Sequence, residues 1–158
     1  MFCISRFGFK RQLEELVQSI NQDQNREFIK QYVNEPSWEE PLRMIAEEIG
    51  MQSVETHMGN DVVKAGKLLI EIVLSVDPIF AADLSRLGGN VIWKQVRTAV
   101  ARRLRSWYAI DDDKHRQCAL AGMLASGSDD FSDIILPLLA SDDQQVRLST
   151  YRAGKEFH

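Results

Sequence analysis

Residues 111–154 read DDDKHRQCALAGMLASGSDDFSDIILPLLASDDQQVRLSTYRAG, and this stretch contains one pattern twice. In each copy an acidic turn precedes a helical segment with an arginine near its start. The two arginines, Arg116 and Arg147, lie 31 positions apart. Between the copies, residues 131–139 form a second apolar segment. Because one helix pair cannot cover both of its apolar faces, a repeated helix pair predicts a stack of such pairs.

The remainder of the chain also has helical periodicity. Apolar residues recur every three or four positions, and no convincing alternating strand pattern occurs. This spacing predicts helices at 10–20, 25–33, 38–49, 62–76, 78–87, 91–108, 114–125, 131–139 and 144–154. The predicted helix starts are a capping box at Ser37 and caps at Asn60, at Asp77 with Pro78, and at Asn90. The predicted stops are Gly50, Gly88–Gly89 and Gly127, with a linker at 51–59. The fold class is therefore all-α.

The segment 62–76 is the most informative single helix. Its clearly polar positions are Lys64, Lys67, Glu71 and Ser75. At 100° per residue these four side chains fall within about 80° of arc. A helix with so narrow a polar stripe is expected to pack against neighbours on several sides, so we predict that it lies at the centre of the core.

Length and composition limit the class of protein to which the chain can belong. The chain has 158 residues, 44% of them hydrophobic, and a net charge of −4. These values predict one folded domain over 1–158, with N-terminal helices at 1–50, central helix pairs at 60–108 and repeats at 111–158. No apolar run is long enough to span a membrane or to act as a signal peptide. Cys3 and Cys118 have no motif spacing, so reduced thiols and a cytoplasmic location are expected.

The stretch from Asp111 to Gly154 resembles a HEAT repeat. The resemblance rests on the Asp-Asp turn, the arginine that follows it, Ala119-Leu120, and the apolar segment at 134–139. From 77 to 108 it is weaker, because the acidic turn and its arginine are absent. It implies stacked antiparallel helix pairs in an α-α superhelix, with turn aspartates and helix arginines bonded between neighbouring units. Since the last unit has no second helix, we expect the chain to be part of a longer solenoid.

The stretch from Tyr32 to Ile49 resembles the helical segment that follows the ATPase core in NACHT-type signalling ATPases. A Trp-x-x-x-Leu pattern, here Trp38 and Leu42, carries this resemblance. In that family the segment leads into a HEAT-like sensor region. This chain has no G-x-x-x-x-G-K-[ST] phosphate loop, so no nucleotide-binding residue is carried over. The resemblance implies only a helical region used for sensing or scaffolding.

The strongest candidate for a contact surface is the basic segment KQVRTAVARRLR at 94–105, which contains no acid. Lys94, Arg97, Arg102 and Arg105 fall within about 140° of one helix face. The opposite face carries Ile92, Trp93, Val96, Ala99, Val100, Leu104 and Trp107. Arg103 falls inside that apolar arc and is expected to extend outward or to find a partner. Such a basic face could be a solvated surface with salt bridges to neighbouring acids, a protein contact or a phosphate contact.

Other residues fit chemical sites less well. Asp111–Asp113 lack the glycine and glutamate of a calcium loop and are better explained as helix caps. His115 and Cys118 lie three positions apart on one helix, but two ligands do not make a zinc site. For His57 we find no partner. Trp93 and Trp107 are expected in the core, and Trp38 at a helix start. The sequence therefore predicts no catalytic residue, metal or cofactor.

These observations predict a non-enzymatic scaffold or sensor module that binds a protein partner or an adjoining domain of its own chain. The predicted contact residues are Lys94, Arg97, Arg102 and Arg105. A nucleic-acid-binding solenoid would use the same face on phosphates. A base-excising enzyme of HEAT-like fold and a purely structural connector also stay open. The sequence does not define the oligomeric state.

Overall fold

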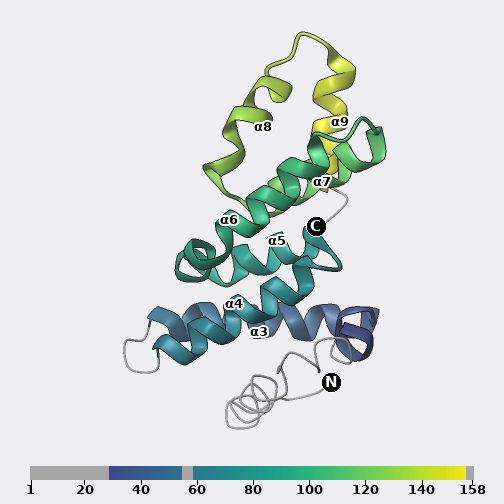
Figure 1. Cartoon of the computed structure of the whole chain (residues 1–158). Coiled ribbons are helices and arrows are strands. Elements are labelled where there is room, and N and C mark those ends of the chain that lie inside the picture. The colour runs from purple at the N-terminus through teal and green to yellow at the C-terminus, as the bar shows by residue number, and fades with distance from the viewer. Residues whose placement is uncertain (1–28, 55–58, 156–158) are drawn as a thin grey trace.

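The computed structural model describes residues 29–54 and 59–155 (Figure 1). The expected helix at 10–20, residues 25–28 of the one expected at 25–33, Cys3 and His57 lie outside these ranges. The described helices are α3 (Glu39–Val54), α4 (Gly59–Leu74), α5 (Pro78–Leu87), α6 (Gly89–Tyr108), α7 (Asp113–Ala125), α8 (Ser132–Leu139) and α9 (Gln144–Lys155). Short helical turns are η1 (Ile29–Val33), η2 (Pro36–Trp38) and η3 (Asp129–Phe131). No strand occurs in these ranges, which confirms the all-α prediction for them.

The helices lie in two rows (Figure 1). In the first row α3 packs against α5, α5 against α7 and α7 against α9. In the second row α4 packs against α6, and side chains of α6 bind the η3–α8 segment. Between the rows α4 lies on α3 and α5, α6 lies on α5 and α7, and α8 lies on α9. Each helix from α3 to α7 thus packs against a neighbour along the chain and against a helix two places away, whereas α8 packs on α9.

Helix α4 occupies the central position that its sequence predicts. It packs against α3, α5 and α6. Six of its apolar side chains are buried: Val62, Ala65, Leu69, Ile70, Ile72 and Val73. On its polar stripe the Lys67 Nζ and Glu71 Oε1 atoms are 3.7 Å apart, forming an i,i+4 ion pair at the surface. The narrow polar stripe therefore marks the one side of α4 that faces water.

Aspartate caps begin two helices as predicted. The Asp77 carboxylate accepts hydrogen bonds from the backbone N–H groups of Ile79 and Phe80, and Pro78 is the first residue of α5. The Asp112 carboxylate accepts the backbone N–H of His115 at 2.9 Å, and its Oδ2 lies 2.6 Å from the His115 ring nitrogen. The backbone bond first, and then the ring bond, lower the pKa of Asp112. Capping is therefore the observed role of this acidic turn, as the sequence indicated.

Three other predicted helix ends are wrong. Ser37 lies inside the turn η2, so the predicted capping box does not form. Helices α4 and α6 begin at Gly59 and Gly89, one residue before the predicted caps Asn60 and Asn90. Gly89 has a φ of 72°, a backbone conformation that favours glycine and lets α6 follow α5 directly.

The predicted stop at Gly50 is also wrong, because α3 continues through Val54. The predicted linker at 51–59 is correspondingly shorter, with residues 51–54 helical. Gly50 is needed instead for close packing. A Cβ atom at this position would lie 2.8 Å from the Leu87 carbonyl oxygen and 3.1 Å from the backbone of Gly88. The glycine lets α3 approach the end of α5 at backbone distance.

Candidate interaction surfaces

Helix α6 has the two faces that its sequence predicts. Ile92, Val96, Val100 and Leu104 are buried. Lys94, Arg97 and Arg102 are exposed on the other side, and the Arg105 side chain keeps 41% of its area accessible. The structure therefore places all four predicted contact residues outside the core. They differ in whether their side chains form ion pairs with acidic residues of the chain.

Arg97 is held by an acid from the turn that precedes α8. Its Nη2 atom donates to Asp130 Oδ1 at 2.7 Å. The same carboxylate accepts the indole N–H of Trp93 at 3.1 Å and the Ser128 hydroxyl at 3.1 Å. Trp93 is partly buried against the core as predicted, and it additionally serves as a hydrogen-bond donor. Asp130 thus joins η3 to α6 through two side chains of α6, Trp93 and Arg97.

Arg105 makes the second connection between α6 and the start of α8. Its guanidinium donates to both carboxylate oxygens of Asp133, at 2.8 and 2.7 Å, and to the Asp130 carbonyl at 2.7 Å. It also lies 5.8 Å from the centre of the Phe131 ring. Hydrogen bonding to Arg105 lowers the pKa of Asp133, and the same bond raises the pKa of Arg105. We call Arg97, Arg105, Asp130 and Asp133 the α6–α8 clamp.

Lys94 and Arg102 differ from the clamp arginines. Neither forms an ion pair with any residue in the described ranges. They lie eight positions apart, about 12 Å along the helix axis, and the exposed Thr98 lies between them. Arg103 is exposed and stacks 5.4 Å from the centre of the Trp107 ring, so it reaches outward as expected. Lys94, Thr98 and Arg102 therefore form the part of the basic surface that has no acidic partner. We call this part the strip Lys94–Thr98–Arg102.

The sequence could not show that Asp130 and Asp133 bind α6. Asp130 belongs to the acidic pair that precedes the predicted helix at 131–139, and Asp133 lies inside that predicted helix. Their partners lie between 25 and 37 positions earlier in the chain. No local spacing rule links residues so far apart. In addition, Arg116 bonds Asp111 of its own turn at 2.9 Å, whereas the HEAT resemblance implied bonds between neighbouring units.

The clamp predicts a measurable change in the titration of Asp133. We expect Arg105→Gln to raise the pKa of Asp133 toward its ordinary value, because the charged hydrogen-bond donor is lost. Since the folded-state pKa is the lowered one, the bond stabilises the fold above the unfolded pKa of about 3.9, and this contribution disappears as pH falls through the folded value. Side-chain carboxyl NMR titration measures the shift. Arg102→Gln is the matched control and should leave Asp133 unchanged; equal titration in both variants would contradict the clamp.

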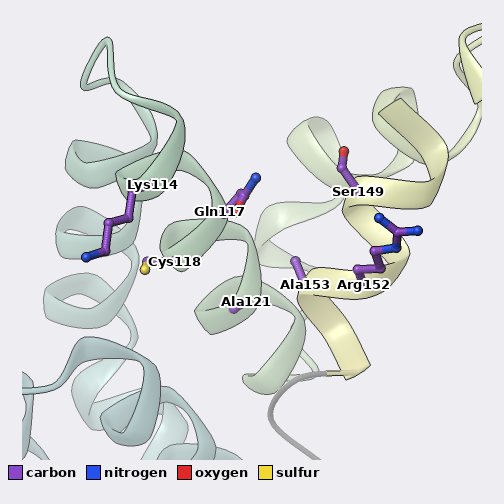
Figure 2. A pocket seen from close by; sticks show the side chains of 7 residues that line it. All are labelled: Lys114, Gln117, Cys118, Ala121, Ser149, Arg152 and Ala153. Atoms are coloured by element: carbon purple, nitrogen blue, oxygen red, sulfur yellow. The ribbon is translucent and has the colours of Figure 1, made fainter. Parts of the chain in front are cut away.

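A shallow groove of about 400 Å³ runs between α7 and α9 (Figure 2). Ala121 and Ala153 form its small side chains, and Gln117 and Ser149 supply polar ones. Lys114 and Arg152 stand at opposite sides of the two helices in Figure 2 and do not point toward one another. Because its charged groups diverge, the groove lacks the convergent polar groups of a small-molecule site.

His115 and Cys118 do not bond each other in this arrangement. The His115 ring is engaged by Asp112, while Cys118 is a partly buried free thiol that lines the groove. Within 29–54 and 59–155 no group of three or more His, Cys, Asp or Glu side chains could hold a metal ion. Trp107 packs against the core as predicted and meets the His115 ring edge to face, with ring centres 5.9 Å apart.

Apolar side chains are exposed on the last two helices. Helix α8 buries none of its residues, and Leu136 on it is 61% exposed. On α9, Leu148 is 37% and Tyr151 57% exposed. The sequence gives one indication of this apolar surface. It predicts that the final repeat lacks a second helix, so part of that repeat is expected to stay uncovered.

Comparisons of the chain with protein-family models, curated proteins and solved structures give no match. Among the described helices none combines the length and the apolar character needed to cross a membrane. The class of protein supported by the structure is therefore an all-α stack of helices, and its activity has to be argued from its surfaces.

Proposed function

We propose that this protein is a non-enzymatic interaction scaffold or sensor module with a HEAT-like superhelical arrangement, forming part of a longer cytoplasmic protein. The 31-residue repeat and the two rows of helices support the arrangement, because each row extends by adding one helix on the last. Extended surfaces of this kind bind partners by area and shape rather than by a deep pocket. The free thiol of Cys118 agrees with a reducing compartment.

The observation that carries the proposal is the strip Lys94–Thr98–Arg102 on a helix without any acid. Two unpaired cations about 12 Å apart on a rigid helix match carboxylates presented by a protein surface. Arg97 and Arg105 contribute indirectly, because they fix α8 beside this strip through the clamp. The partner proposed here is therefore an acidic protein surface.

Nucleic acid is the less favoured partner for the same face. Two of the four predicted phosphate-binding residues already bind carboxylates of this chain. The net charge of −4 also opposes association with a polyanion, since nucleic-acid-binding domains usually carry a basic surface and a positive balance.

Charge reversal of the strip tests the function. A partner protein is first captured from source cells with the wild-type chain and is then purified. We expect the double variant Lys94→Glu, Arg102→Glu to lose binding to this purified partner. Lys67→Glu with Lys114→Glu makes the same change in net charge elsewhere and should retain binding. Capture that is lost on nuclease treatment would support the nucleic-acid alternative. Binding of the purified partner that is equal for both double variants would refute the strip as the contact.

A further inference from the structure

Helix α6 carries two pairs of cations with the same spacing. Arg97 and Arg105 of the α6–α8 clamp are eight positions apart, and so are Lys94 and Arg102 of the strip. The strip pair is shifted by three residues, which is about 4.5 Å along the helix axis and about 60° around it. The two pairs therefore have the same geometry on neighbouring faces of one helix. Within the described ranges only the clamp pair binds acids.

The clamp shows which acidic motif such a pair of cations binds. Its acids, Asp130 and Asp133, lie three positions apart where η3 leads into α8. Arg97 donates one bond to its acid, from Nη2 to Asp130 Oδ1 at 2.7 Å. Arg105 donates to both carboxylate oxygens of Asp133, at 2.8 and 2.7 Å. Acids are favourable at a helix start because the free N–H groups there attract negative charge. The bound motif is thus a helix start with two acids three positions apart.

The strip offers the same two kinds of contact in the same order. Lys94 takes the position that Arg97 has in the clamp pair, and an ammonium group can donate the single bond that is made there. Arg102 takes the position of Arg105, and it retains the planar guanidinium that binds both oxygens of a carboxylate. Thr98, midway between the strip cations, is exposed and small, so it leaves room for the backbone that joins two acids.

The strip lies in the interior of the stack of helices and not at one of its ends. In the second row α6 lies between α4 and the η3–α8 segment. Helices added before α3 or after α9 would extend the rows and would leave the outward side of α6 uncovered. Continuation of the solenoid therefore does not supply an occupant for the strip.

We infer that the strip binds a helix start of a partner protein on which two aspartates or glutamates lie three positions apart. The inference rests on the proposed function, since it specifies which acidic surface the strip recognises. The partner's first acid accepts one hydrogen bond from Lys94, and its second acid accepts two from Arg102. The partner segment consequently lies beside α8 and has the same orientation on α6 as α8 has.

Two synthetic peptides test the spacing of the acids. Both are alanine-rich helices of equal length and composition, with helicity checked by circular dichroism. One has glutamates at its first and fourth positions, and the other has them at its first and sixth positions, which do not share a face. NMR titration of the full chain follows the backbone amide signal of Thr98. We expect the first peptide to bind about three- to fivefold more tightly, the gain that a second exposed ion pair provides.

Exchange of the two cation types tests the order of the contacts. Lys94→Arg should retain binding of the first peptide, because a guanidinium can also donate a single bond. Arg102→Lys should weaken binding about threefold, because an ammonium does not match the planar bidentate geometry. Both variants keep the charge of the strip, so each is the matched control of the other. Equal affinities of the two variants would contradict the assignment of Arg102 to the second acid.

The indole N–H of Trp93 reports whether the peptide binds the strip or the clamp, because it donates to Asp130. Equal affinity of the two peptides, no binding of either, or an upfield shift of this indole signal that marks loss of its bond would each overturn the inference. The proposed function would still stand if the double variant Lys94→Glu, Arg102→Glu lost binding to the purified partner. Partner binding that survives this double variant would refute the proposed function and the inference together.

Discussion

Replacing Phe131 with alanine is expected to lower the free energy of unfolding by about 3–5 kcal/mol, the range for removing a fully buried aromatic ring. Phe131 has no exposed surface and is among the largest fully buried side chains in the described ranges. It ends the turn η3, and the Arg105 guanidinium lies over its ring. The substitution therefore opens a cavity and removes the apolar support beneath the α6–α8 clamp.

The effect should be large because Phe131 is the one buried residue of the η3–α8 segment, 129–139. None of the residues of α8 itself is buried, so Phe131 and the clamp acids hold its start against α6. Urea unfolding followed by circular dichroism measures the loss. Leu136→Ala on the same segment removes an apolar side chain that is 61% exposed, and it should change stability by less than about 0.5 kcal/mol. Equal losses for the two variants would show that η3 is not anchored through the Phe131 ring.

Much of the fold follows from local rules because the deciding residues act on their own neighbours. The narrow polar stripe of 62–76 identified the central helix, since helical geometry alone fixes which side chains share a face. Asp77 and Pro78 set the start of α5 through bonds to residues two and three positions away. Such short-range effects are readable from the sequence without knowing what the helix packs against.

The candidate surface was predictable only in part. Helical spacing correctly placed Lys94, Arg97, Arg102 and Arg105 outside the core, but it could not separate the paired arginines from the unpaired cations. That distinction depends on Asp130 and Asp133, which reach α6 through the packing of distant segments. Salt bridges to neighbouring acids are one of the interpretations that the basic segment allows, and for Arg97 and Arg105 this interpretation describes the observed contacts.

Gly50 shows the opposite failure, in which a correct local rule gives the wrong result. Glycine often follows the last turn of a helix, so the sequence predicted a stop. Here the helix continues, and the reason for glycine lies in the contact with residues 87–88. A local rule cannot detect this, because the other side of the contact lies more than thirty positions later in the chain.

Gly50→Ala should accordingly destabilise the protein by about 1–3 kcal/mol, the usual cost of adding atoms to a tightly packed contact. Helix propensity alone predicts the opposite sign, a gain of about 1 kcal/mol, because alanine is the better residue inside a helix. Steric overlap should prevail because the nearest atoms, at 2.8 and 3.1 Å, belong to the backbone of Leu87 and Gly88. Backbone cannot change rotamer, so α3 and the α5–α6 turn must move apart.

Gly154→Ala is the matched control for this overlap. Gly154 is also helical, but a Cβ atom there would lie 3.3 Å from Cδ1 of Leu124, the end of a flexible side chain that can adjust. We expect Gly154→Ala to be neutral or stabilising under the same urea unfolding conditions. A Gly50→Ala protein that matched Gly154→Ala in stability would mean that propensity governs both positions. The close approach of α3 to the α5–α6 turn would then be too loose to explain why glycine occupies position 50.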